Sequence, residues 1–318
     1  MTKRAVLLVS HGTVDDLDDL PAFVTNIRRG HAPPPELVDE LRTRYQAIGG
    51  QSPLNAINAD VARALEAHLA RFGVAVRAAN RLWRPYPRDV LAGLAGEGIT
   101  RIAAIPLAQH SARVYADSVR AAAASIEREG GPRLDVACAA DWGQTPELVD
   151  AFAARARAAL LAIPEGERRA TALVVSAHSL PAAAIAEGDA YERELRASAD
   201  AIFARLGADC PAHRAIAFQS QGMSTGPGGR KVEWLGPDLP ATFRALRDAG
   251  ATRVVILPAG FLADHVEILY DLDVEARALA EAIGMTLTRT ASLNASPDLV
   301  AALAAVARPL LAELGGGA

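Results

Sequence analysis

The chain alternates two kinds of hydrophobic pattern along its length. Short, continuously apolar runs that stop at Gly, Pro, Ser or a polar residue are typical of buried strands, whereas longer runs with apolar residues three and four apart are typical of helices. The predicted strands are Ala5–Ser10, Ala75–Asn80, Arg101–Leu107, Leu134–Ala139, Ala170–Ser176, His213–Gln219, Arg253–Pro258 and Thr286–Thr290. The predicted helices are Asp60–Phe72, Tyr115–Glu129, Pro146–Ala162, Tyr191–Leu206, Leu239–Ala249, His265–Ile283 and Pro297–Leu314. Strands that alternate with helices predict an α/β fold in which helices flank parallel sheets.

The same pattern occurs twice along the chain. Residues 98–107 match residues 250–259, since both begin with Gly-x-Thr-Arg and end at Pro and one apolar residue. The strand that ends at His11 likewise matches the strand that ends near His178. We therefore predict two similar lobes, residues 1–165 and residues 166–318, with the C-terminal helix in the second. Because open parallel sheets bind ligands at the carboxyl ends of their strands, these histidines are predicted to lie at a ligand site.

Two stretches without periodicity mark connections in this pattern. The Pro/Gly/Glu-rich stretch 163–168 is the predicted boundary between the lobes, and the Gly-rich stretch 222–236 is predicted to be a loop.

The composition narrows the class of protein. Hydrophobic residues make up 51% and charged residues 22% of the 318 residues, which is typical of a folded chain. The net charge is −4 and no block of Lys or Arg occurs, so nucleic acid is not an expected partner. The two cysteines are too few for a disulfide framework or for an all-cysteine iron–sulfur cluster. The first apolar run is too short for a signal peptide or a transmembrane segment, so a cytoplasmic location is expected.

Three carboxylates follow the strand that ends at Pro258. Glu267, Asp271 and Glu275 are four residues apart and would share one face of an α-helix. Like charges on one stripe repel each other, and the stripe becomes favourable where it meets a cation. Because oxygen ligands suit hard divalent ions, the pattern predicts either a path for a metal ion or a solvated acidic helix face.

His178 follows a buried strand at the point where a side chain projects toward a ligand site. A neutral imidazole binds a divalent metal or accepts a proton near neutral pH. His178 is therefore either a partner of the carboxylates or a structural histidine at the strand end.

Basic and aromatic residues gather near a Gly-Gly turn in the first lobe. Arg28, Arg44 and Tyr45 precede Ser52 in this segment. Arg pairs with a carboxylate through two hydrogen bonds, and Tyr packs on a ring or donates a hydrogen bond. The segment suits a flat anionic ligand, or it is a helix with exposed charges followed by a turn.

With these segments in view, the sequence resembles the ferrochelatase family over nearly its whole length. Ser176–Pro181 matches the family's histidine motif, and Pro258–Asp273 matches its glutamate motif. Phe218–Gln221 with Trp234–Asp238 matches a third signature. The resemblance implies a class II chelatase-like fold of two Rossmann-like lobes with a porphyrin between them. It also implies a lyase of haem biosynthesis that inserts iron(II) into a porphyrin.

The resemblance assigns roles to individual residues. His178 and Glu267 are similar to the family's metal-binding and catalytic pair. Asp271 and Glu275 are similar to outer carboxylates that relay metal toward it. The positions that match porphyrin contacts are His11, Arg28, Arg44, Tyr45 and Ser52.

The compact segment between Arg28 and Ser52 resembles that of the monomeric coproporphyrin-type enzymes. The resemblance therefore favours coproporphyrin III over protoporphyrin IX and implies a monomer. The expected partners are the porphyrin and iron(II), both substrates, and no tightly bound cofactor is expected.

The chain departs from the compact members of the family at His11 and Gly143, where they usually have Tyr. The segment Ser10–Thr13 also resembles the cobalt and nickel chelatases of sirohydrochlorin metabolism. Two alternatives therefore stay open. One is a cobalt or nickel chelatase for another tetrapyrrole, and the other is a non-catalytic haem or porphyrin-binding protein with His11 as an axial ligand.

Overall fold

The computed structural model describes residues 3–222 and 231–315. The chain divides into two units. The first comprises Met1–Glu147, Ala263–His265 and Asn294–Ala318, and the second comprises Leu148–Leu262 and Val266–Leu293. Residues 223–230, most of the stretch predicted to be a loop, lie outside the described residues.

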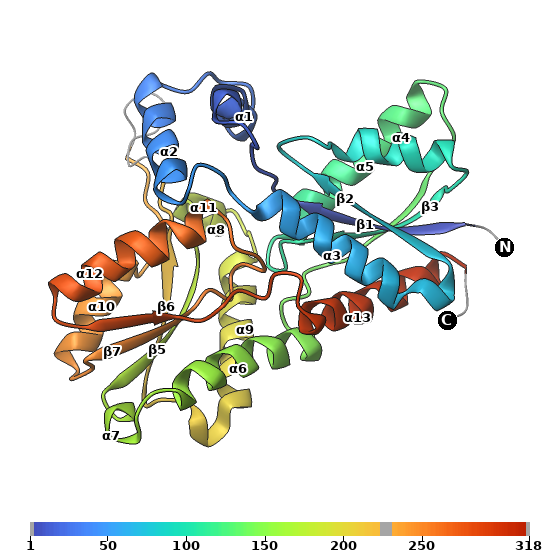
Figure 1. Cartoon of the computed structure of the whole chain (residues 1–318). Coiled ribbons are helices and arrows are strands. Elements are labelled where there is room, and N and C mark those ends of the chain that lie inside the picture. Colours follow the sequence, from blue (N-terminus) through green and yellow to red (C-terminus); the bar gives the residue numbers. More distant parts are fainter. Residues whose placement is uncertain (1–2, 223–230, 316–318) are drawn as a thin grey trace. The chain divides into compact units, whose positions relative to one another are not determined.

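The elements follow one another as alternating strands and helices (Figure 1). Those up to the end of the first sheet are β1 (Arg4–Ser10), α1 (Leu20–Ile27), α2 (Pro35–Ala47), α3 (Leu54–His68), β2 (Val74–Asn80), α4 (Pro87–Gly96), β3 (Arg101–Pro106), α5 (Ala112–Arg128) and β4 (Asp135–Cys138). Those that follow are α6 (Pro146–Leu161), α7 (Glu165–Arg168), β5 (Thr171–His178), α8 (Ala182–Ala186), α9 (Tyr191–Leu206), β6 (His213–Gln219), α10 (Leu239–Asp248), β7 (Arg253–Leu257), α11 (Val266–Leu269), a π-helical turn η5 (Asp271–Ala276), α12 (Arg277–Ala282), β8 (Thr286–Arg289) and α13 (Pro297–Glu313).

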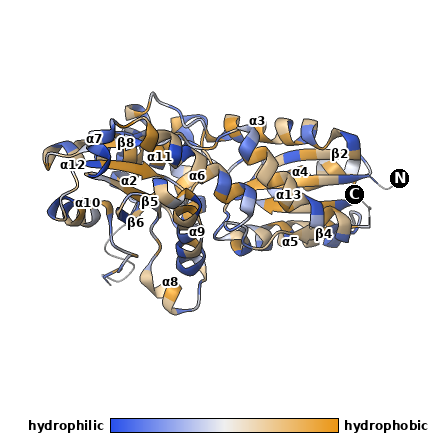
Figure 2. Cartoon of the chain, turned by 90° about the horizontal axis from the view of Figure 1, so that it is seen from below, coloured by the Kyte–Doolittle hydropathy of each residue, from blue (hydrophilic) through white to orange (hydrophobic). Residues whose placement is uncertain are grey.

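The first unit is built on a four-stranded parallel sheet in the order β2-β1-β3-β4. All side chains from Ala5 to Val9 in β1 are fully buried, because helices cover both faces of the sheet. Leu7 packs with α4 and α5, and strand alternation turns Leu8 to the opposite face, which α3 and α13 cover. In Figure 2 the helices show both orange and blue stretches, as helices with one apolar face should.

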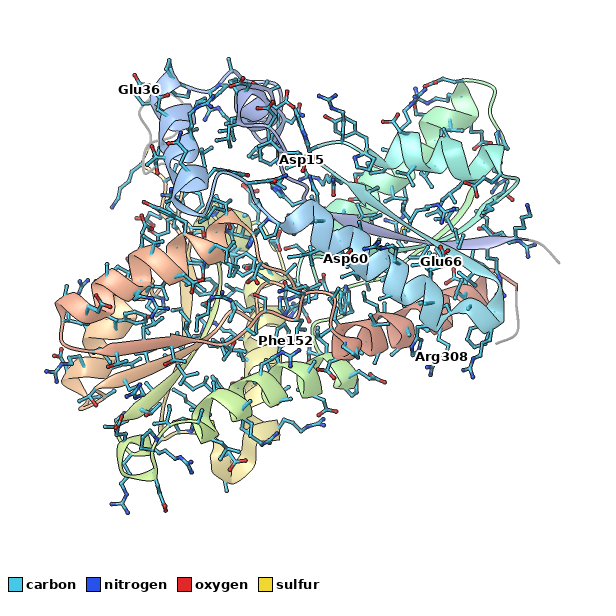
Figure 3. The ribbon with its side chains drawn as sticks, viewed as in Figure 1. Asp15, Glu36, Asp60, Glu66, Phe152 and Arg308 are labelled. Carbon is cyan, nitrogen blue, oxygen red and sulfur yellow. The ribbon has the colours of Figure 1, made fainter. Side chains whose placement is uncertain are left out.

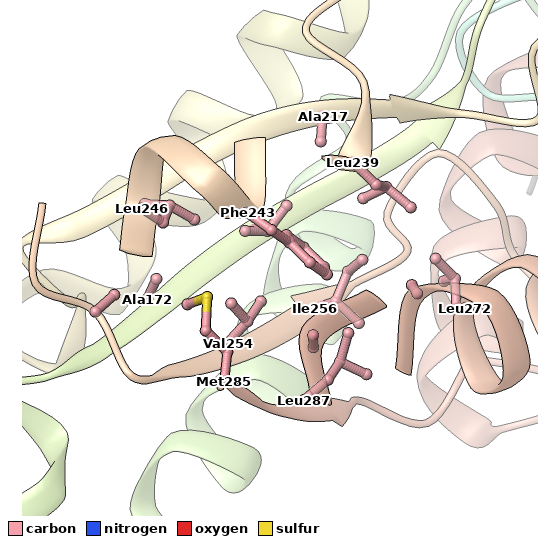
Figure 4. Close-up of a cluster of buried hydrophobic side chains, with 14 of the residues drawn as sticks. Ala172, Ala217, Leu239, Phe243, Leu246, Val254, Ile256, Leu272, Met285 and Leu287 are labelled. Carbon is pink, nitrogen blue, oxygen red and sulfur yellow. The ribbon is translucent and has the colours of Figure 1, made fainter. Parts of the chain in front are cut away.

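The second unit repeats this topology in the order β6-β5-β7-β8, again all parallel. One face of the sheet is covered by α10, α11, η5 and α12. Phe243 is fully buried there, against Val254 and Ile256 of β7 and Leu272 of η5 (Figure 4). The prediction of two similar lobes with parallel sheets flanked by helices is therefore confirmed.

The C-terminal helix belongs to the first unit, although it follows the whole second unit in the sequence. Its apolar stripe, which includes Leu299 and Leu303, is buried, and the helix packs against α3, β3 and β4. Figure 3 shows α13, marked by Arg308, alongside α3, marked by Asp60. The division near Glu147 thus differs from the expected boundary at 165, and the terminal helix covers the first sheet instead of the second.

The predicted strands all occur, each within two residues of its expected ends. Helices α1, α4, α7 and α8 were not predicted, and α2 was expected only as one of two alternatives. Each begins at or next to a proline, a residue that usually ends a predicted helix. Proline is nevertheless well tolerated in the first turn of a helix, because no backbone N–H is needed there. The regular helix predicted over 265–283 is interrupted by the π-helical turn η5.

Candidate active site

The end of β5 carries His178 toward the face of the sheet that α11 covers. Successive side chains of a strand alternate, and since Ala177 packs with α9 on one face, His178 points to the other. The chain leading from β7 to α11 passes very close to this point. A Cβ on Gly260 would lie 2.5 Å from Ala177 Cα, and Gly260 N donates to Ser176 O at 3.0 Å. Helix α11, which carries Glu267, therefore begins beside the end of β5.

His178 and Glu267 form a hydrogen-bonded pair. His178 Nδ1 lies 3.1 Å from Glu267 Oε2, and the two side chains are 36% and 33% exposed. Because a carboxylate only accepts, the neutral imidazole carries its proton on Nδ1 and keeps a lone pair on Nε2. A carboxylate that orients a histidine in this way is the usual partner of a metal-binding imidazole. The pair can therefore ligate a metal ion or accept a proton through Nε2.

The surroundings of His178 make it a stronger base than free imidazole. Burial acts to lower the pKa of His178, whereas the charge and hydrogen bond of Glu267 and the charge of Asp271 act to raise it. The carboxylates outweigh burial, and the pKa of His178 lies above its ordinary value.

The carboxylates that follow Glu267 do not lie on a regular α-helix. In the π-helical turn Glu275 N donates to Tyr270 O at 3.0 Å, five residues back, where an α-helix would use the carbonyl four residues back. The three carboxylates also differ in burial: Glu267 is half-buried, Asp271 is buried and Glu275 is exposed. The expected regular acidic helix face is therefore not formed, and the three carboxylates differ in exposure, with Asp271 the most buried of them.

Two contacts hold the π-helical turn in place. The Asp271 carboxylate accepts a hydrogen bond from Ser220 Oγ, and Ser220 adopts the left-handed region with φ of +58°. Asp273 forms a two-point ion pair with Arg289 of β8, both contacts at 2.8 Å. The turn is thus fastened to the loop after β6 on one side and to β8 on the other.

Two further residues of this site were not assigned a role from the sequence. Gln219 Nε2 donates to Glu267 O at 3.1 Å, and Gln219 O accepts from Ser179 N at 2.7 Å. Tyr191 OH donates to His178 O at 2.8 Å. One feature of the sequence could have indicated a role for Gln219. It is the last residue of the predicted strand His213–Gln219.

In the first unit, His11 follows β1 in a tightly packed loop. Its ring packs edge-on against Phe23, with the centroids 5.9 Å apart, and Nδ1 lies 3.1 Å from Gly12 O. Gly12 has φ of +86°, and a Cβ there would lie 2.5 Å from Asn80 Cβ. Only glycine fits this position, so the loop that presents His11 is sterically fixed.

Tyr45 and Ser52, two of the expected porphyrin contacts, are buried in the first unit. Tyr45 OH lies 2.6 Å from Thr13 Oγ1, which connects α2 to the loop after His11. Ser52 Oγ has no hydrogen-bond partner among residues 3–222 and 231–315.

The two arginines expected at the porphyrin are only partly exposed. Arg28 follows the last residue of α1, and Arg44 forms an ion pair with Glu40 at 2.8 Å on α2. Gly143, which replaces a tyrosine of the compact enzymes, is buried and donates from its N–H to Gln109 O at 3.1 Å.

The described part of the chain bears on the expected chemistry in three further ways. In those residues no group of three or more His, Cys, Asp and Glu side chains is arranged to hold a metal ion. Cys138 and Cys210 are both free thiols. No helix in the same ranges is both long and apolar enough to cross a bilayer.

Comparison with known proteins identifies the family. A family model described as Ferrochelatase matches residues 3–310. Similar curated proteins include a ferrochelatase of Acidobacterium capsulatum, 36% identical, which covers 98% of this chain and 96% of its own length. A coproporphyrin III ferrochelatase of Geobacillus kaustophilus is also 36% identical, with the same coverage. One of Bacillus subtilis is 34% identical and covers 96% of both chains.

Solved structures of low sequence identity share the fold. SirB from Bacillus subtilis with Fe3+ has a TM-score of 0.59 and 15% identity, covering 98% of this chain and 96% of its own. The multi-domain protein DR2241 from Deinococcus radiodurans, described as similar to chelatases, has a TM-score of 0.52 and 17% identity, covering 96% of this chain and 55% of its own. With a family model over residues 3–310 and curated relatives at 36% identity across nearly the full length, the chain belongs to the ferrochelatase family.

Proposed function

We propose that this chain is a lyase that inserts iron(II) into coproporphyrin III in haem biosynthesis. The observation that carries the proposal is the pair His178–Glu267, an oriented imidazole of raised pKa, at the strand ends of a ferrochelatase-family chain. The curated relatives support this function over a cobalt or nickel chelatase and over a non-catalytic porphyrin carrier.

Metal insertion exchanges two pyrrole protons of the macrocycle for one divalent ion. We assign the acceptance of a pyrrole proton to His178 Nε2, since the raised pKa lets the imidazole keep that proton. Glu267 stabilises the imidazolium through Nδ1 and offers its carboxylate to the ion. The half-exposed pair leaves a path to solvent for the second proton. Binding a bent macrocycle, whose nitrogen lone pairs are exposed, would favour the transition state over the flat substrate.

Asp271 and Glu275 are proposed to deliver the ion to this pair. The support is that Glu275 is exposed to solvent and that Asp271 lies between Glu275 and Glu267 in the sequence. Carboxylate oxygens suit iron(II) in transit because they are hard ligands that exchange with water.

The porphyrin contacts are proposed for His11, Arg28, Arg44, Tyr45 and Ser52. Arg28 and Arg44 suit the carboxylates of the macrocycle, because a guanidinium pairs with a carboxylate through two hydrogen bonds. Coproporphyrin III carries more carboxylates than protoporphyrin IX, which supports it as the substrate, as do the names of the Geobacillus and Bacillus relatives. Tyr45 and Ser52 are buried and would support the contact surface from beneath.

The test is an anaerobic iron(II) insertion assay with each of the two porphyrins. We expect turnover by the unmodified protein, faster with coproporphyrin III, and none by His178→Ala, whose circular dichroism should be unchanged. The matched control is His68→Ala, an exposed histidine in the last turn of α3, which should behave like the unmodified protein. Near-normal turnover by His178→Ala would reject the catalytic pair. Insertion of cobalt or nickel without iron would reject the choice of metal.

We further propose a cytoplasmic monomer without a tightly bound cofactor or nucleic-acid partner. The resemblance to compact coproporphyrin-type enzymes supports the monomer, and two cysteines are too few for an all-cysteine iron–sulfur cluster. Light scattering and the absorption spectrum of the purified protein would test these points.

A further inference from the structure

We infer that Gln219 is a positioning residue for iron insertion, which ties the strand end bearing His178 to the helical turn bearing Glu267. The inference rests on the proposed function, since it concerns the geometry of that pair. Gln219 itself has no assigned place in the chemistry, because both of its hydrogen bonds go to backbone groups.

The contacts of Gln219 reach both sides of the pair. In the parallel register of β5 and β6, Gln219 lies beside His178. Its carbonyl accepts from Ser179 N at 2.7 Å, which fixes the residue that follows His178. Its side-chain Nε2 donates to Glu267 O at 3.1 Å, which fixes the turn of α11. Because one strand end supplies both bonds, the backbone after His178 and the backbone of Glu267 are held in place relative to one another.

The chemistry of a carboxamide explains why this position holds Gln. The contact with Glu267 requires a donor, which neither a carboxylate nor an apolar side chain supplies. A glutamate here would also add a negative charge beside the carboxylates of Glu267 and Asp271. Gln219 is only 4% exposed, and its Oε1 has no hydrogen-bond partner among the described residues. A buried acceptor without a hydrogen bond lowers the free energy of unfolding. The Nε2 donor is therefore the end of the carboxamide that stabilises the site.

The first unit uses the same arrangement at the equivalent place. Asn80 ends β2 beside Ser10 of β1, just as Gln219 ends β6 beside His178 of β5. Asn80 is also 4% exposed, and its Nδ2 donates to Arg84 O at 2.8 Å while Oδ1 accepts from Ser10 Oγ at 2.6 Å. In both units a buried carboxamide at the end of the neighbouring strand therefore donates to a backbone carbonyl close to the histidine-bearing end of β1 or β5.

The experiment compares Gln219→Met, which keeps the length but removes both polar ends, with Gln219→Glu, which keeps the shape but removes the donor. The matched control is Gln221→Met, an exposed glutamine two residues away. Iron kinetics are measured at saturating coproporphyrin III, Zn²⁺ binding by calorimetry without porphyrin, porphyrin binding by fluorescence, and folding by thermal unfolding. Because misplacement of reacting groups by about 1 Å costs up to about 100-fold, we expect kcat/KM for iron to fall by about 10- to 100-fold in both Gln219 variants.

We also expect Zn²⁺ affinity to fall about three- to tenfold in Gln219→Met, which adds no charge. Porphyrin affinity should be unchanged in both variants, and Gln221→Met should match the unmodified protein. The inference is overturned if Gln219→Glu stays within about twofold of the unmodified protein in iron kcat/KM, if folded Gln219→Met keeps the Zn²⁺ affinity of the unmodified protein, or if porphyrin affinity falls in parallel. Should Gln219→Met unfold, the isosteric Gln219→Glu decides. An unmodified protein that inserts no iron would refute the proposed function, while the Zn²⁺ affinities would still decide on the positioning role.

Discussion

Gly260 lets α11 start beside the end of β5, so Gly260→Ala tests whether this close approach sets the geometry of the metal-binding pair. A Cβ at Gly260 would lie 2.5 Å from Ala177 Cα, whereas ordinary van der Waals contact begins at 3.4 Å. The obstacle is backbone and cannot rotate away. The turn between β7 and α11 must therefore move by about 1 Å.

This displacement is expected to lower stability moderately and turnover strongly. Overpacking of this kind typically costs about 1–3 kcal/mol, and each kcal/mol lowers Tm by about 2–4 °C in a domain of this size. The effect on turnover is larger, because the shift is comparable to the tolerance of the 3.1 Å contact between His178 Nδ1 and Glu267 Oε2. A misplacement of about 1 Å can cost about 100-fold in rate. Turnover should thus fall much further than the loss of stability alone would explain.

The assay measures Tm by calorimetry and iron insertion well below the unfolding transition. Gly166→Ala is the matched control in the same unit, because a Cβ at Gly166 meets no atom within 4 Å. It should keep full activity and gain slightly in stability, since alanine favours a helix over glycine by about 1 kcal/mol.

The double variant Gly260→Ala with Ala177→Gly separates a backbone collision from a side-chain collision. It should remain inactive, because the obstacle at Ala177 Cα is still present. If the double variant recovers activity, or if Gly260→Ala alone has the turnover and Tm of the unmodified protein, the reasoning is refuted.

Three further predictions concern other contacts. Burial lowers and Glu267 raises the pKa of His178, with a net increase, so Glu267→Gln should lower that pKa in an NMR titration. The pair adds its full contribution to the unfolding free energy below the ordinary histidine pKa of about 6.5, and this contribution is lost as pH rises through the raised pKa of the folded state. The difference in unfolding free energy between the unmodified protein and Glu267→Gln should therefore shrink toward alkaline pH. Leu303→Ala should cost the first unit about 2–5 kcal/mol, seen in calorimetry as a lower transition for that unit, and no change would contradict the placement of α13. Asp273→Asn breaks the ion pair with Arg289 and should lower the unfolding free energy by about 1–3 kcal/mol in urea denaturation, and Asp273→Glu should restore part of it.

The strands were predicted from the sequence more accurately than the helices that pack on the two sheets. Strands such as Ala5–Ser10 are buried on both faces, and their apolar runs are therefore continuous and easy to recognise. The resemblance also implied the pairing of His178 with Glu267, whose side chains lie 3.1 Å apart. Long-range packing was not accessible in the same way: the apolar stripe of α13 shows that the helix is buried, but not which sheet buries it.

The local backbone conformation and the burial of individual site residues could not be predicted from the sequence either. The spacing of Glu267, Asp271 and Glu275 is compatible with an α-helix, whereas the π-helical turn is in contact with residues distant in the sequence, Ser220 and Arg289. Tyr45 was expected at a ligand but is buried, because its hydroxyl meets Thr13 across the packing of α2.

The return of α13 to the first unit has a consequence for how the protein is made. At translation rates of about 5–20 residues per second, the ribosome needs on the order of 10 s to add the residues between Glu147 and Pro297. During that time the face of the first sheet that Leu299 and Leu303 will cover lacks its final helix. The second unit is complete at Leu293, before α13 is synthesised. The nascent chain thus completes its second unit before its first, and the first unit is the one that exposes apolar surface to solvent while synthesis continues.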